Sequence, residues 1–81
     1  MRVLKLESSD EWLCLLESVK GLSHGSNTFY VMREQTEDSY IYTAIGAELM
    51  FSCSTKGKPQ EFEKHIQGYG FMVFKGKGFL Q

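Results

Sequence analysis

Two cysteines and two histidines are the side chains of this 81-residue chain that are best suited to binding zinc. They are Cys14, His24, Cys53 and His65. No two of them stand at the spacing of a zinc-ligand pair, and neither cysteine belongs to a CxxC motif. The spacing therefore predicts no metal site and no cofactor. It indicates two free thiols in a reducing compartment, with Cys14 on the outer side of a helix and Cys53 in the core.

Catalysis would require a nucleophile and a base held together in a pocket. A chain of 81 residues forms one domain, residues 1–81, with a modest core that rarely encloses such a pocket. No spacing in the sequence indicates a catalytic pair. We therefore predict that the protein is not an enzyme.

Two clusters of lysine and glycine near the C-terminus are the candidates for an anion site. Their basic side chains are Lys56, Lys58, Lys75 and Lys77. Glycine lets backbone N–H groups approach a phosphate, but neither cluster has the spacing of a phosphate-binding loop, so solvated loops are the simpler interpretation. Four basic and eight acidic residues lie in 1–54, whereas five lysines and two glutamates lie in 55–81. An anion site would thus be local, because the whole chain carries a net charge of −1.

The elements that must position these groups follow in the order β-α-β-β-β-α-β. The first helix should run from residue 9 to 20, capped by Ser8, with an apolar stripe that includes Trp12. Gly46 and Ala47 are predicted to form a two-residue hairpin turn, and Pro59 to begin a short second helix. The predicted strands are residues 3–6, 28–35, 39–45, 48–54 and the run after Gly68. This order predicts an α+β fold, a single mostly antiparallel sheet with two helices on one face.

The last predicted strand is the most aromatic run of the chain, and we expect it to be central. The octapeptide Gln67-Gly68-Tyr69-Gly70-Phe71-Met72-Val73-Phe74 resembles the RNP1 motif of RNA-recognition motif domains, with departures at its first and sixth positions. The resemblance implies that Tyr69 and Phe71 would stack bases on an open sheet face. In that family the motif precedes the second helix, whereas here it follows it. We therefore interpret the run as an aromatic surface rather than as family membership.

The strand period of two divides the sheet residues between two faces. The predicted core face holds Phe29, Val31, Ile41, Thr43, Ile45, Leu49, Phe51, Cys53, Met72 and Phe74. The predicted opposite face holds Tyr30, Met32, Tyr40, Tyr42, Met50, Ser52, Tyr69 and Phe71. Tyrosine and methionine suit an amphipathic surface, and this set would expose more apolar area than a monomer usually leaves in water.

We therefore predict a small interaction module that binds a protein partner, or a second copy as a homodimer, through this tyrosine-rich face. The predicted contact residues are Tyr30, Tyr40, Tyr42, Tyr69 and Phe71. Size and composition are typical of inhibitors, immunity proteins and phage accessory proteins, by analogy. The sequence lacks an apolar run of membrane-spanning length and a signal peptide, so we expect a cytoplasmic protein that does not bind membranes.

Two alternatives remain open from the sequence. The first is a binder of single-stranded nucleic acid or a nucleotide, with the aromatic rings stacking on bases and Lys75 and Lys77 contacting phosphate. The second is that the C-terminal residues 76–81 fold back over part of the tyrosine-rich face. A steep dependence of binding on salt would distinguish the nucleic-acid binder.

Overall fold

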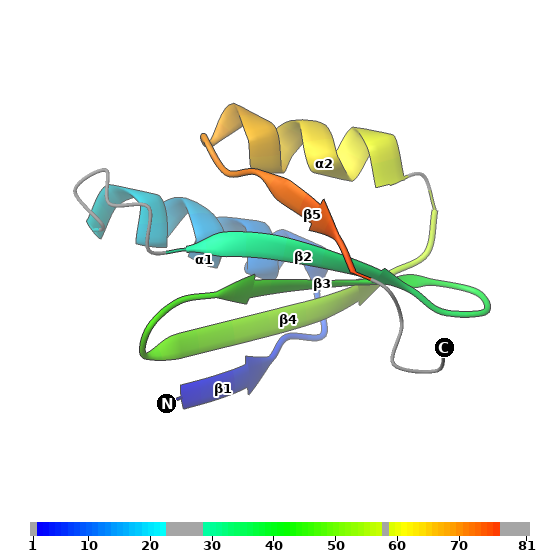
Figure 1. Ribbon diagram of the computed structural model, residues 1–81, viewed down its shortest axis with the longest axis horizontal. Helices are drawn as coiled ribbons and strands as arrows, with labels where there is room; N and C mark the ends of the chain where they lie inside the picture. The colour runs from blue at the N-terminus through cyan, green and yellow to red at the C-terminus, as the bar shows by residue number, and fades with distance from the viewer. Residues whose placement is uncertain (1, 23–28, 58, 77–81) are drawn as a thin grey trace.

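Five strands and two helices follow one another along the described part of the chain in the predicted order (Figure 1). The computed structural model describes residues 2–22, 29–57 and 59–76. The elements are β1 (Arg2–Lys5), α1 (Ser9–Leu22), β2 (Tyr30–Gln35), β3 (Tyr40–Ile45), β4 (Leu49–Thr55), α2 (Pro59–Gly68) and β5 (Val73–Lys75). The predicted α+β fold class is confirmed.

The sheet has five strands in the order β1-β4-β3-β2-β5. The two central ladders, β2 with β3 and β3 with β4, are antiparallel, and the two outer ladders are parallel. Parallel neighbours need a crossover connection, and α1 and α2 provide the two crossovers. The prediction that the last strand is central is wrong, because β5 is a three-residue strand at one edge.

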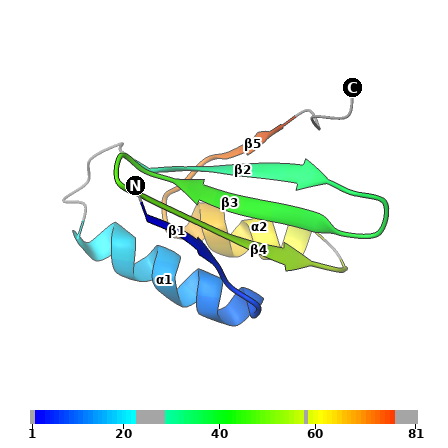
Figure 2. The ribbon, with the colours of Figure 1, turned by 90° about the horizontal axis from the view of Figure 1, so that it is seen from below.

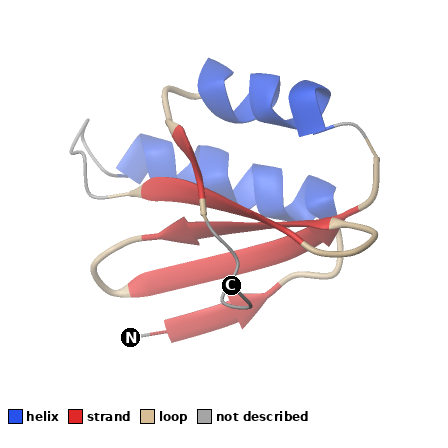
Figure 3. Cartoon of the chain, turned by 45° about the vertical axis from the view of Figure 1, so that its right-hand side comes forward, coloured by secondary structure: helices blue, strands red, loops and turns tan. Residues whose placement is uncertain are grey.

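Both helices lie on the same side of the sheet (Figures 2 and 3). Between the two layers lies one core of buried side chains: Trp12, Leu16, Val19, Val31, Tyr42, Ala44, Phe51, Cys53 and Ile66. The indole N–H of Trp12 donates a 3.0 Å hydrogen bond to the carbonyl oxygen of Phe51, so α1 is tied to β4 by a polar contact as well as by packing. Neither α1 nor α2, the helices of the described part of the chain, is long and apolar enough to span a membrane.

The start of α1 follows the predicted capping pattern. The hydroxyl oxygen of Ser8 accepts hydrogen bonds from the backbone N–H groups of Asp10 and Glu11, at 3.2 and 3.3 Å. These contacts satisfy two of the donors that a helix leaves unpaired at its start. The helix continues to Leu22, two residues beyond the predicted end.

The turn between β3 and β4 lies one residue later than predicted. Ile45 pairs with Met50, and the N–H of Gly46 donates a 2.8 Å hydrogen bond to the carbonyl of Leu49. The two turn residues are therefore 47 and 48. Gly46 is required by space rather than by turn geometry, since a Cβ there would lie 2.5 Å from the ring of Phe29.

Gly70 closes the C-terminal end of α2. It has a φ of 95°, its N–H donates to the carbonyl of Gln67 at 2.9 Å, and the N–H of Phe71 donates to Ile66 at 3.3 Å. These two bonds form a Schellman motif, in which a glycine in the left-handed conformation ends a helix. The octapeptide that resembles RNP1 thus spans a helix end, a turn and the start of an edge strand.

Candidate functional site

The face of the sheet opposite the helices is built from alternate residues of every strand. Cross-strand pairs such as Met50 with Ile45 and Met32 with Phe74 identify its members, because register partners share a face. We call it the helix-free face: Val3, Lys5, Tyr30, Met32, Glu34, Ile41, Thr43, Ile45, Met50, Ser52, Ser54, Met72 and Phe74.

The helix-free face grades from apolar to polar along the strand direction. Its first cross-strand row contains Val3, Met50, Ile45 and Tyr30, and Met72 continues this row beside β2. Its second row is mixed: Lys5, Ser52, Thr43, Met32 and Phe74. Its third row, Ser54, Ile41 and Glu34, is mostly polar. The apolar surface is therefore one continuous band across the sheet.

The large apolar side chains that the described residues expose most all lie on the helix-free face. They are Val3 at 64%, Tyr30 at 41%, Met72 at 68% and Phe74 at 46% exposure. Together with the half-buried Met and Ile side chains beside them, they form one apolar patch on the helix-free face. The largest apolar patch of a monomer is often functional, so this patch is the candidate interaction surface.

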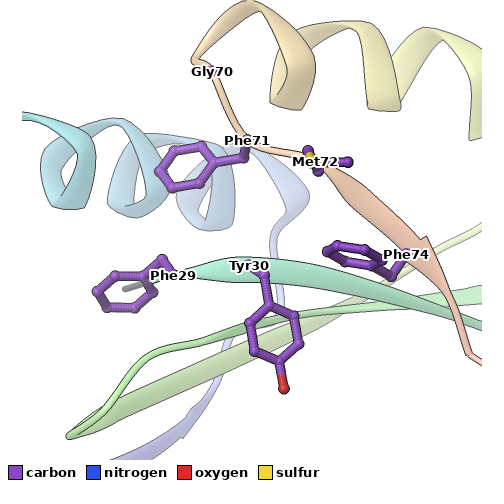
Figure 4. A pocket seen from close by; sticks show the side chains of 6 residues that line it. All are labelled: Phe29, Tyr30, Gly70, Phe71, Met72 and Phe74. Carbon is purple, nitrogen blue, oxygen red and sulfur yellow. The ribbon is translucent and has the colours of Figure 1, made fainter. Parts of the chain in front are cut away.

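A groove of about 490 Å³ opens at the corner where β2 and β5 begin (Figure 4). Phe29, Tyr30, Gly70, Phe71, Met72 and Phe74 line it. The rings of Tyr30 and Phe74 meet edge to face, with centroids 5.8 Å apart. A second hollow of about 200 Å³ lies near the opposite edge of the sheet and is lined by Lys5, Leu6, Ile41, Ser52, Cys53 and Ser54. Each edge of the helix-free face therefore has a recess.

Of the five predicted contact residues, only Tyr30 lies on the helix-free face. Tyr42 is fully buried beneath the helices, with its ring 4.6 Å from that of Phe62. Tyr40, Tyr69 and Phe71 are half-buried and pack against the core. Their predicted placement on an open face is wrong, because on β3 and β5 the residues predicted for the open face point toward the helices and those predicted for the core point away from them.

The converse error concerns five residues that were predicted to lie in the core. Ile41, Thr43, Ile45, Met72 and Phe74 lie on the helix-free face instead. The assignments on β2 and β4 are correct, with Val31, Phe51 and Cys53 buried. The open surface is therefore rich in methionine and isoleucine rather than in tyrosine.

A charged cluster fixes α2 to the sheet on the helix-covered side. The guanidinium of Arg33 pairs with the Glu63 carboxylate at 2.5 Å, and the hydroxyl of Tyr42 donates to the same oxygen at 2.8 Å. Burial, followed by this hydrogen bond and the Glu63 charge, raises the pKa of Tyr42 well above its usual value. In the described residues no buried side-chain polar atom lacks a partner, so we interpret the cluster as structural.

The candidate anion-binding lysines do not form a shared site in the described residues. Lys56 follows β4 and Lys75 ends β5, and both are exposed. β3 and β2 lie between these strands, which implies a separation of about 14 Å. Lys58 and Lys77 lie outside the described residues.

The two thiols lie where the sequence predicts. Cys14 is exposed and Cys53 is buried, and neither forms a disulfide. Burial raises the pKa of Cys53 to about 12, so it stays protonated at neutral pH. His65 is exposed, and His24 lies outside the described residues. Among the residues that the structure describes, no group of three metal-binding side chains is found.

No protein-family model matches this chain, and no curated protein matches it either.

Proposed function

We propose that this protein is a non-enzymatic interaction module that binds a protein partner, which can be a second copy of itself, through its helix-free face. One observation carries the proposal: among the described residues, the most exposed large apolar side chains all gather on that face. Burial of this surface by a partner would contribute about 25 cal/mol for each Å² removed from water. By analogy of size and composition, we extend the proposal to an intracellular, cytoplasmic role of the inhibitor, immunity or phage accessory type.

The charge of the helix-free face favours a protein over a nucleic acid. Lys5 and Glu34 are its charged side chains, so its charge is balanced. Binding of a single strand requires a basic groove with rings presented to the bases. The two exposed rings, Tyr30 and Phe74, meet at 85° and so offer no flat stacking platform.

Site-specific photo-crosslinking in the native host tests the proposal. A benzophenone amino acid at position 45, on the helix-free face, should give crosslinked protein products that survive nuclease treatment. The control places the same group at position 17, on the exposed side of α1. Equal labelling from both positions, or products that nuclease removes, would contradict the proposal.

A further inference from the structure

We infer that the partner of the helix-free face is a second copy of this chain, packed face to face about a twofold axis that runs along β3. This inference rests on the proposed function. β3 is the middle strand, so an axis along it places β4 over β2 and β1 over β5 of the second copy. All five strands of each copy are then covered.

The direction of the axis follows from the rows of the helix-free face. An axis along the strands places each cross-strand row over the same row of the second copy, so the apolar row meets an apolar row. Ile45 then meets Ile45 of the second copy, and Met50 lies over Tyr30, a favourable sulfur–aromatic pair. An axis across the strands would instead place the apolar row over the polar row that contains Glu34, or leave half of the face uncovered.

The two edges of the face are complementary under this symmetry. Val3 and Met72 are the most exposed apolar side chains and lie at opposite ends of the same row, so each meets the other across the interface. Phe74 of one copy lies over Lys5 of the other, beside the smaller hollow. A lysine over an aromatic face is an attractive contact.

No charge of the helix-free face opposes a like charge in this arrangement. Glu34 lies over Ser54, whose hydroxyl can donate to the carboxylate.

The sheet edges offer less to a second copy. Arg2 and Lys5 flank β1, and a basic edge strand resists pairing with its own copy. β5 has only three residues and ends in a lysine.

The size of the face sets the expected strength of association. Five strands about 4.8 Å apart and three rows about 7 Å apart give a flat footprint of about 500 Å². Standard interfaces bury about 800 Å² on each partner. We therefore expect a weak, concentration-dependent dimer.

Cysteine crosslinking tests the axis. In a Cys14→Ser background, which removes the exposed thiol, Thr43→Cys lies on the axis opposite its own copy, whereas Lys5→Cys lies about 20 Å from its own copy. A short bis-maleimide spans the roughly 10 Å between packed sheets. We expect Thr43→Cys to give at least tenfold more covalent dimer than Lys5→Cys alone. A mixture of Lys5→Cys with Phe74→Cys should restore crosslinking.

Other outcomes overturn the inference in distinguishable ways. Efficient crosslinking of Lys5→Cys alone would indicate pairing of β1 edges. Absence of crosslinking from all variants, with native Trp12 fluorescence, would show that the purified chain is a monomer. If the photo-crosslinker at position 45 still captured another protein, the homodimer would be wrong and the proposed function would stand. If it captured none, both would fail.

Discussion

The two faces of this sheet alternate residue by residue along the same strands, yet they differ in composition and in what covers them. The helix-covered face holds the rings of Tyr42 and Phe51 beneath Trp12, and all three side chains are fully buried. The helix-free face holds mainly methionine, isoleucine and serine, and leaves its edges in water. Aromatic content therefore does not identify the open face of the sheet. A tyrosine can be buried where its hydroxyl has a partner, as Tyr42 has in Glu63.

The largest effect should come from the centre of the helix-covered face. Trp12→Ala should reduce the free energy of unfolding by about 3–5 kcal/mol, because it removes a fully buried ring and the hydrogen bond from its indole N–H to the Phe51 carbonyl. Urea titration followed by circular dichroism measures the change. Val3→Ala on the helix-free face is the control and should cost less than about 0.5 kcal/mol. Similar losses for both variants would remove the distinction between the faces.

A smaller loss should come from the rim of the core. Gly46→Ala should cost about 1–3 kcal/mol, because the new methyl group would overlap the Phe29 ring. The double variant Gly46→Ala with Phe29→Ala should recover part of that loss, since the smaller side chain makes room. A single variant as stable as the wild type would show that Phe29 does not pack over the turn.

The buried tyrosine should make stability sensitive to alkaline pH. Its pKa is raised on folding, so the unfolded chain loses the Tyr42 proton first, and stability falls as pH rises above about 10. Cys53 acts in the same direction from pH 9.0 upward, because burial raises its pKa to about 12. Tyr42→Phe should cost about 1 kcal/mol at pH 7 and should flatten the decline above pH 10. Urea midpoints between pH 7 and pH 11 measure both effects, and an unchanged slope in the variant would contradict the assignment.

Two glycines at the end of α2 should respond in opposite directions. Gly70→Ala should lose about 1 kcal/mol, because alanine is strained at a φ of 95°. Gly68→Ala should gain up to about 0.5–1 kcal/mol, since its Cβ meets no atom within 4 Å and alanine favours the helix. Thermal midpoints of the two variants test this. Equal losses would indicate that the glycines of the aromatic run serve something other than the helix end.

Local signals were sufficient to predict the elements and the helix contacts. Ser8 and Pro59 mark helix starts by their backbone chemistry, and Trp12 lies on a stripe of helical period, so no distant contact was needed. The phase of β3 could also have been predicted. The two loops that flank β3, residues 36–39 and 47–48, each hold an even number of residues. In an antiparallel pair joined by such a loop, an even-numbered residue of one strand pairs with an odd-numbered residue of the other, so the phase of β2 or β4 fixes that of β3.

The predicted two-residue turn already requires Tyr42 to share a face with Cys53, whereas the composition of β3 taken alone favours the opposite phase. The phase of β5 could not be obtained in this way. β5 joins β2 in parallel after a helix, so no short loop fixes its register. The cap at Gly70 and the packing of Phe71 and Val73 on the core set it, and both depend on the folded structure.

Sedimentation velocity tests the role of the helix-free face most directly. Wild-type protein between about 10 μM and 1 mM should shift from the 9.3 kDa chain toward twice that mass. Ile45→Glu should remain a folded monomer throughout, because two carboxylates would meet at the twofold axis without water. Gln60→Glu, which adds the same charge on the exposed side of α2, should behave as the wild type. A wild type that stays monomeric, or an Ile45→Glu variant that associates equally well, would contradict the homodimer through the helix-free face.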